Sequence, residues 1–401
     1  MSGPLAGIKV LELGTLIAGP FAARLLAEFG AEVIKVEDPD GGDPLRRWRY
    51  LHQGTSLWWA VQARNKKSVG LNLKDERACA LARRLALEAD VVVENFRPGV
   101  LEKLGLGYAQ LREHNQATIM VRLSGYGQTG PMRERPGFGA IGEAMGGIRH
   151  VTGYPDRPPV RIGLSIGDSI AALHAVIGTL MALRHRDATG GRGRGCGQMI
   201  DVALYESVFN LMESTVPEYD RFGVVRERTG TSLPGIVPSN TYTCQDGAAI
   251  VVGGNGDAIF RRLMAAIERA DLGSDPQLAH NDGRVPRAGE IDAAIQRWCS
   301  GRSIEQALAA LEQAQVPASR IYSVADMFCD PQFSARAMIE QFTLGDGTPL
   351  KVPGIVPKLS ETPGATRWLG PALGEHTDEV LGSIGVSREQ IERLRSDGAI
   401  V

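Results

Sequence analysis

The chain has 401 residues, with 44 lysines and arginines, 46 aspartates and glutamates, and a formal net charge of −2. A chain of this length can bury a large core and is typical of two domains or one elaborated domain. The balanced charge provides no basic field for nucleic acid or an anionic membrane, so any anionic ligand must be bound locally. The N-terminal residues lack a secretory signal and no apolar segment is convincing as a membrane span, which together predict a cytoplasmic protein.

The five cysteines and seven histidines are scattered along the chain. They form neither a C-x-x-C pair nor a set with metal-ligand spacing, so we expect reduced cysteines and no metal site. His174 lies within an apolar helical run, a position typical of a structural histidine.

The first predicted elements are a strand, a turn, a helix and a second strand over residues 8–37. Pro20 suits the first helical position and Gly30 suits the helix end. Further strands are predicted at "KSVGLNL", "DVVVEN" and "ATIMVRLSGYG", with an amphipathic helix at "DERACALARRLALEA". Alternating strands and helices predict a parallel sheet covered on both faces, with ligands at the turns after the strands.

The first of these turns, "GTLIAGP", does not fit a dinucleotide site. Gly14 and Gly19 do not form G-x-G-x-x-G, and Pro20 removes an N–H where a pyrophosphate needs donors. Glu37 does lie about where a ribose-binding acid is found in such sites. On balance we expect no nicotinamide cofactor.

Positive charge follows two later strands. The segment "RNKKSVGLNLK" contains Lys74, and "NFRPGVLEKLG" contains Asn95, Phe96, Arg97 and Lys103. An amide, an aromatic face and a planar donor fork after a buried strand fit a nucleotide with phosphates. Two further glycine-rich turns, "RLSGYGQTGP" and "VVGGNGD", permit positive φ and close approach of backbone N–H groups to an oxyanion, although each also fits an ordinary tight loop.

Asp168 is the single carboxylate between residues 161 and 186 and directly precedes a long apolar run. An Asp in this place is typical of a helix N-cap. The same place suits a reactive carboxylate, because the helix dipole favours the ionised form. The two interpretations are compatible.

A change of composition at "TGTSLPGIVPSNTY" marks a long connection, after which a new strand, turn and helix begin. We predict a large domain over residues 1–224, a small α/β domain over 225–328 and a C-terminal segment over 329–401. The proline-rich and glycine-rich tail is expected to run over a surface.

Together these motifs resemble the class III coenzyme A transferases, which include formyl-CoA, carnitine and succinyl-CoA-dependent dicarboxylate transferases. The resemblance covers nearly the whole chain, from "PLAGIKVLELGTLIAGPFAARLLAEFGAEVIKVE" through "IGDSIAALHA" to the "GGNGD" loop. The nucleophile of that family is the Asp of the "GD" before a helix, which implies that Asp168 attacks an acyl-CoA. The implied intermediates are an acyl-aspartyl anhydride and then an aspartyl-CoA thioester.

The resemblance also implies which residues bind coenzyme A: Ile17, Ala18, Leu71, Lys74, Asn95, Phe96, Arg97, Lys103, Ser124, Gly125 and Tyr126. It implies that Gly253, Gly254, Asn255 and Gly256 form a mobile loop over the aspartate, with backbone donors for the oxyanion. Two positions depart from the family pattern, since Asp38 stands where relatives often have arginine and Gln128 where some have Glu. Acyl-CoA and a small carboxylic acid are the implied substrates, without a metal or redox cofactor.

The implied fold is a Rossmann-like large domain and a small domain in an open ring, with the C-terminal segment returning to the large domain and two chains interlocked as a homodimer. The pattern resembles enzymes that transfer CoA from succinyl-CoA to small dicarboxylates. The candidates for binding a distal carboxylate are Arg46, Arg49, Arg135 and Arg161. An acyl-CoA racemase of the same architecture, which requires an acid/base pair, and a non-catalytic CoA-binding protein are the alternatives.

Overall fold

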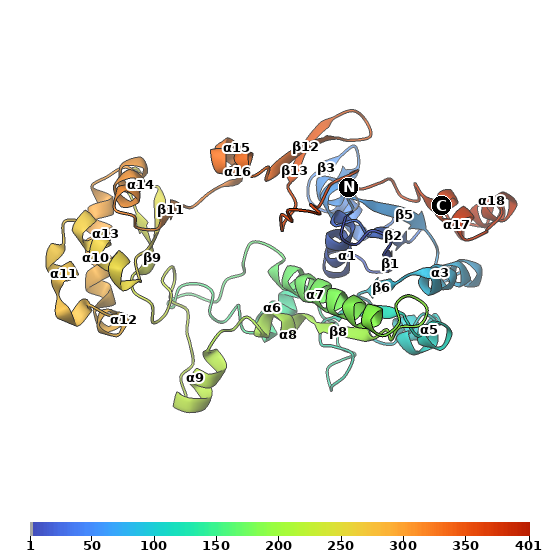
Figure 1. Ribbon diagram of the computed structural model, residues 1–401, viewed down its shortest axis with the longest axis horizontal. Coiled ribbons are helices and arrows are strands. Elements are labelled where there is room, and N and C mark those ends of the chain that lie inside the picture. Colours follow the sequence, from blue (N-terminus) through green and yellow to red (C-terminus); the bar gives the residue numbers. More distant parts are fainter. Residues whose placement is uncertain (1–2) are drawn as a thin grey trace. The chain divides into compact units, whose positions relative to one another are not determined.

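The computed structural model describes residues 3–401 and divides into two units (Figure 1). The large unit is formed by the chain up to residue 148, by residues 162–224 and by residues 337–401. The small unit is formed by residues 149–161 and 225–336. The predicted α/β class with a parallel sheet is confirmed.

The sheet of the large unit has six parallel strands in the order β5-β2-β1-β6-β7-β8. Their bounds are β1 (Lys9–Glu12), β2 (Glu32–Glu37), β5 (Lys66–Gly70), β6 (Val91–Glu94), β7 (Ile119–Ser124) and β8 (Met199–Ala203). β6 (VVVE) and β7 (IMVRLS) are short runs rich in β-branched and apolar residues, which is typical of strands buried on both faces, whereas β5 (KKSVG) is not. Because all six run in one direction, their carboxyl ends lie along one edge of the sheet.

Successive strand residues point to opposite faces and build two separate cores. Val10 and Val33 face a core that contains α1 (Ala18–Glu28) and α7 (Ile166–Ala188). Leu11 faces the other core. The helices of that second face are α3 (Glu76–Glu88), α5 (Tyr108–His114), α17 (Thr377–Ser383) and α18 (Arg388–Ser396).

Two local predictions concern α1. Gly30, with φ of +104°, follows the end of this helix, as predicted. Pro20 is the third residue of the helix and not the first, because the helix begins at Ala18. The remaining elements of the large unit are β3 (Leu51–His52), β4 (Thr55–Ser56), α2 (Leu57–Gln62), α4 (Val100–Lys103), α6 (Gly139–Met145), α8 (Leu204–Phe209), α9 (Thr215–Phe222), β12 (Ile339–Thr343) and β13 (Pro349–Pro353).

α7 is the one helix among residues 3–401 that is long and apolar enough to span a membrane by length and composition. Ala171, Ala175 and Ala182 on its inner face are buried in the core of the large unit. The core helix of a soluble protein meets the same criteria of length and composition.

The small unit has its own core around an antiparallel sheet in the order β11-β10-β9. Its strands are β9 (Ser239–Thr243), β10 (Ala249–Gly253) and β11 (Ala318–Arg320). Its helices are α10 (Asp257–Ala266), α11 (Ala270–Ser274), α12 (Asn281–Arg284), α13 (Ala288–Ser300), α14 (Ile304–Gln313), α15 (Val324–Cys329) and α16 (Pro331–Ala335).

The units differ from the predicted domains in two places. Residues 149–161 were assigned to the large domain, but the Arg228 side chain donates to the carbonyl of His150 and the Gly230 N–H donates to that of Gly153. The predicted small domain ended at 328, yet the small unit continues to 336. Its last helices are held by the Tyr322 hydroxyl, which donates to Asp330 at 2.6 Å.

Candidate active site

A cavity of about 610 Å³ lies at the carboxyl edge of the large unit's sheet. Four of the residues predicted to bind coenzyme A line it, namely Leu71, Lys74, Phe96 and Lys103. The cavity also includes residues that the sequence did not single out: Leu13, Thr15, Lys35, Val36, Asp40, Gly42, Asp43, Pro44, Arg47, Asn72, Leu73, Val100 and Leu104. Glu37 and Asp38 complete the lining.

The two predicted lysines contribute positive charge to this cavity, beside Lys35 and Arg47. Lys74 and Lys103 are exposed, and neither ammonium group has an ion-pair or hydrogen-bond partner among residues 3–401. Phe96 and Leu71 supply apolar surface beside them, and Leu71 is fixed by a β-bridge to Ile400. Apolar walls with unpaired cations at the rim suit a nucleotide with phosphates.

Asn95 does not line the cavity. Its side-chain oxygen accepts from the Thr15 N–H, and its amide nitrogen donates to the Thr15 carbonyl, each at 2.8 Å. Both ends of the amide therefore bind the first turn of the sheet, and a contact of Asn95 with the nucleotide stays a prediction.

Asp43 holds the next residue of the same turn. Leu16 has φ of +66°, a conformation that is strained for a branched side chain, and its N–H donates to both carboxylate oxygens of Asp43 at 3.1 Å. Asp43 in turn pairs with Lys35 at 2.9 Å. The strained backbone is thus held by a buried ion pair.

Beneath this turn, charged side chains are buried in a connected network. Lys35 also pairs with Glu12 at 2.7 Å, and Glu12 pairs with Lys66 at 2.6 Å. Burial alone raises the pKa of Asp43, but Lys35 and the N–H groups of Leu45 and Leu16 hold its net pKa below the usual value. Asp43 is therefore ionised at neutral pH.

Three other predicted contacts lie elsewhere. Ile17 and Ala18 are buried and do not line the cavity, because they form the start of α1 against the core. Arg97 is exposed and also outside the lining. Among the candidates for a distal carboxylate, Arg46 is buried with both its Nε and Nη2 donating to Glu37 at 2.8 Å, which makes it unavailable.

Asp168 lies in the first turn of α7 and is half-buried. The N-cap interpretation is wrong, because the helix begins at Ile166 and Ser165 occupies the cap position. As the third residue of the helix, Asp168 still lies where the dipole favours a carboxylate.

The Asp168 carboxylate is seated against the bare backbone of Gly139, the first residue of α6. A Cβ atom on Gly139 would lie 2.0 Å from the carboxylate oxygen Oδ2. Gly139 does not have a positive φ, so close approach is the reason for glycine here. Gly139 was not among the predicted site residues, although the glycine spacing in "GFGAIGEAMGG" was a signal of close packing.

A second pair of glycines places the turn after β7 beside this segment. A Cβ atom on Gly125 would lie 2.8 Å from the Cα of Gly137, and one on Gly137 would lie 3.4 Å from the ring of Tyr126. Ser124 is buried, and its hydroxyl accepts from the Gly127 N–H at 3.0 Å. The predicted residues 124–126 are thus connected to the Asp168 site through residues 137–139 and do not line the cavity.

Glu143 is a further buried carboxyl group near this site. It is 1% exposed, and its Oε1 accepts from the Gly167 N–H at 3.4 Å. Glu143 therefore connects α6 to the residue directly before Asp168.

In the small unit, Gly253 ends β10 and Gly254–Gly256 follow it, and only part of this segment has free backbone donors. The N–H groups of Gly253 and Gly254 already donate to the carbonyls of Pro317 and Pro238 at 2.9 Å. Those of Asn255 and Gly256 have no hydrogen-bond partner among residues 3–401. The loop's glycines do not have a positive φ. Gly254 is required for space, because its Cβ atom would lie 2.5 Å from Leu263.

His174, one of two histidines on the Asp168 helix, has a partner for each ring nitrogen, as expected of a structural histidine. The ring nitrogens of His174 lie 3.0 Å from the Ile170 carbonyl and 3.2 Å from Asn210. Across the described chain, no group of three or more His, Cys, Asp or Glu side chains is arranged to hold a metal ion.

Comparison with known proteins decides between the possible families. The family model for CoA-transferase family III matches residues 5–377. The chain belongs to this family. The predicted resemblance to the class III coenzyme A transferases is therefore confirmed. The predicted enzyme class, a CoA-transferase, is confirmed as well.

Individual family III relatives match over almost their whole length. The chain is 47% identical over 399 residues to a succinyl-CoA–D-citramalate CoA-transferase of Chloroflexus aurantiacus, covering 99% of this chain and 98% of that one. It is 35% identical to a succinate–glutarate CoA-transferase of Agrobacterium fabrum, covering 97% of each chain. A crystal structure of a CAIB/BAIF family protein from Brucella suis matches with a TM-score of 0.82 and 33% identity, over 96% of this chain and 100% of that one.

Proposed function

We propose that this CoA-transferase transfers CoA from succinyl-CoA to a small dicarboxylate through covalent intermediates on Asp168. The observation that carries the proposal is the placement of the Asp168 carboxylate in the first turn of α7, against the backbone of Gly139. A carboxylate held in one orientation beside a helix N-terminus is suited to attack a carbonyl carbon.

The proposed reaction begins when an oxygen of Asp168 attacks the thioester carbonyl of succinyl-CoA. The C–S bond breaks, which gives a succinyl-aspartyl anhydride and CoA thiolate. The thiolate attacks the aspartyl carbonyl, the bond to the succinyl oxygen breaks, and succinate leaves an aspartyl-CoA thioester. The acceptor carboxylate then attacks this thioester to form a new anhydride, and the released thiolate takes the acceptor's acyl group and regenerates Asp168.

In this proposal the cavity holds the nucleotide part of coenzyme A. Lys74 and Lys103 would pair with phosphates, and Phe96 and Leu71 would contact apolar or aromatic parts of the ligand. The role of the glycine loop stays a prediction, restricted to the N–H groups of Asn255 and Gly256 as oxyanion donors.

Intact-protein mass spectrometry after incubation with succinyl-CoA tests the covalent step. The expected adduct equals the mass of CoA less one water, is removed by hydroxylamine, and is absent from Asp168→Ala and Asp168→Asn. An unmodified wild type that still binds CoA would contradict the proposal and favour a non-catalytic CoA-binding protein.

The acceptor is tested with a panel of acids. The names of the relatives support citramalate, malate and glutarate as acceptors. The panel also contains itaconate, mesaconate, succinate and oxalate. Transfer to monocarboxylates alone would contradict a dicarboxylate acceptor. Exchange of an α-deuterium without transfer would instead indicate the racemase, an activity for which His174 offers no free base.

We also propose that the enzyme acts as a homodimer in the cytoplasm. An exposed apolar stripe on α7 supports the dimer, since Leu173, Ile177, Leu180 and Met181 are each more than 40% exposed. Sedimentation should give twice the chain mass of 43.1 kDa for the wild type and a lighter species for Ile177→Asp. Wild-type sedimentation at the mass of one chain would contradict the dimer, and cell fractionation tests the location.

A further inference from the structure

Two adjacent arginines end the loop after β2, and their side chains have different surroundings. Residues Pro44–Arg47 form a 3₁₀ turn capped by Asp43, which accepts from the Leu45 N–H at 2.9 Å. Arg46 is buried, bound to Glu37, with its guanidinium 3.8 Å from the centre of the Trp59 ring. Arg47 is exposed and lines the cavity.

The Arg47 guanidinium has a defined seat without an acidic partner. A Cβ atom on Gly41, whose φ is +83°, would lie 2.3 Å from its Nη1, so the side chain lies against bare backbone. Asp38 and Asp40 line the same cavity, yet Arg47 forms no ion pair with them or with any other residue among 3–401. Its donors are therefore available to a ligand.

The place of Arg47 in the fold indicates which phosphate it meets. In Rossmann-like folds the segment after the second strand recognises the ribose, and an arginine nearby accommodates a phosphate on that ribose. Glu37, at the end of β2, cannot act on a ribose here because Arg46 and Ser68 occupy its oxygens. Coenzyme A carries a 3′-phosphate on its ribose, and a guanidinium is suited to bind phosphate with two parallel hydrogen bonds.

We infer that Arg47 binds the ribose 3′-phosphate of coenzyme A and so selects coenzyme A over ligands that lack this phosphate. The inference rests on the proposed function for the identity of the ligand. Lys74 and Lys103, which reach the cavity from the turns after β5 and β6, remain for the other phosphates.

The test compares succinyl-CoA with succinyl-3′-dephospho-CoA in the wild type and in Arg47→Ala. Loss of a charged hydrogen-bonding partner should lower kcat/KM for succinyl-CoA about 10- to 100-fold, mainly through KM. The kcat/KM for succinyl-3′-dephospho-CoA should change less than about twofold between the wild type and Arg47→Ala. Gly41→Ala should also lower the ratio of kcat/KM for succinyl-CoA to kcat/KM for the dephospho substrate, because the added methyl group displaces the Arg47 guanidinium.

Arg77→Ala is the matched control. Arg77 lies three residues after Lys74, is exposed and paired with Asp75 and Asp397, and does not line the cavity. Its removal takes away one nearby positive charge and should leave the ratio of the kcat/KM values for the two substrates unchanged.

Calorimetric titration of CoA and 3′-dephospho-CoA into the same proteins needs no catalysis, so it separates this inference from the proposed function. We expect Arg47→Ala to bind CoA more weakly than the wild type does, and to bind 3′-dephospho-CoA as tightly as the wild type does. Equal losses for both ligands, or no loss for either, would overturn the assignment even if transfer through Asp168 is established.

Discussion

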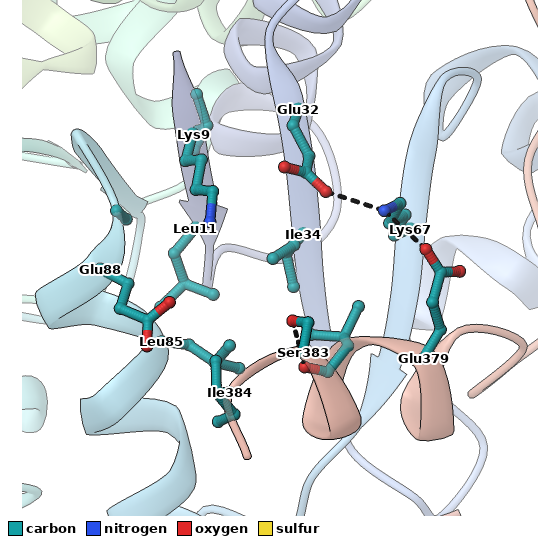
Figure 2. Close-up of a pocket in the computed structure, with 13 residues that line it drawn as sticks. Lys9, Leu11, Glu32, Ile34, Lys67, Leu85, Glu88, Glu379, Ser383 and Ile384 are labelled. Atoms are coloured by element: carbon teal, nitrogen blue, oxygen red, sulfur yellow. Dashed lines mark hydrogen bonds and ion pairs between the residues drawn. The ribbon is translucent and has the colours of Figure 1, made fainter. Parts of the chain in front are cut away.

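The two edges of the parallel sheet both carry charged residues around a cavity, but the basic side chains are arranged differently at each edge. At the amino edge lies a cavity of about 240 Å³, and its apolar lining includes Leu11 and Ile34 (Figure 2). Lys67 lines it and is paired with Glu32 and Glu379 at 2.8 Å each, whereas Lys9 in the same lining has no ion pair among residues 3–401 (Figure 2). These ion pairs connect β2, β5 and α17.

At the carboxyl edge the arrangement is reversed. Glu12, Lys35 and Asp43 are buried, with Lys35 paired to both acids, and Lys35 and Asp43 line the cavity. Three exposed cations of the same cavity, Arg47, Lys74 and Lys103, have no partner in the part of the chain that the structure describes. The Lys67 ion pairs hold three elements together at the amino edge, whereas the unpaired cations at the carboxyl edge suit an anionic ligand.

The largest expected effect comes from Gly139→Ala at the carboxyl edge. The added Cβ would lie 2.0 Å from Oδ2 of Asp168, so the carboxylate must move. A displacement of about 1 Å at a reacting group lowers the rate about 100-fold. We expect at least this loss in kcat for transfer, measured beside the yield of the hydroxylamine-sensitive adduct.

Gly163→Ala is the control for this prediction. Gly163 precedes Asp168 by five residues, and a Cβ atom there would have nothing within 4 Å. CoA binding by Gly139→Ala should persist, since Gly139 does not line the cavity. A wild-type rate in Gly139→Ala would show that the carboxylate's seat is unimportant.

The second prediction concerns the unpaired cations. Lys74→Ala and Lys103→Ala should each raise the KM for succinyl-CoA about tenfold, with smaller changes in kcat. Because the contact is with phosphate at an exposed rim, the wild-type KM should rise with ionic strength and the double variant should show a weaker dependence. An equal salt dependence in both proteins would contradict the assignment of phosphate to these lysines.

The third prediction concerns stability. Asp43→Asn keeps an oxygen for the Leu16 N–H but leaves Lys35 with one carboxylate fewer. Breaking a buried pair in this way should lower the free energy of unfolding by about 3 kcal/mol, measured by urea denaturation at pH 7. Asp38→Asn, an exposed acid in the same loop, should change it by less than about 0.5 kcal/mol.

The same variant predicts a pH dependence. The folded pKa of Asp43 is lowered, so its contribution to stability is present above the unfolded pKa of about 4 and is lost as the pH falls through the folded pKa. Asp43→Asn should therefore lose less stability than the wild type between pH 5 and the acid transition. Parallel curves for the two proteins would show that Asp43 is not held ionised by Lys35.

The sequence predicted features that depend on near neighbours. Val91–Val93 read as a buried strand because apolar β-branched residues are consecutive, and Lys74, Phe96 and Lys103 were found because they follow such strands. Contacts between distant segments were not accessible. Thr15 and Asn95 are 80 residues apart, and no local pattern shows that the amide of Asn95 is used by the first turn. Gly139 and Asp168 likewise meet only after α6 and α7 pack.

The smallest effect is expected at the amino edge, and it tests the other half of the comparison. Burial lowers the pKa of Lys67, but Glu32 and Glu379 raise it by more than burial lowers it. The net pKa is therefore above the usual value, and the side chain is charged at pH 7. Lys67→Met removes both ion pairs and should lower the free energy of unfolding by about 0.5 kcal/mol, as is typical of partly exposed pairs. The kcat and KM for succinyl-CoA should not change. If this variant instead weakened CoA binding as much as Lys74→Ala, the charges of the two edges would act on the ligand together, and the separation between a structural edge and a binding edge would fail.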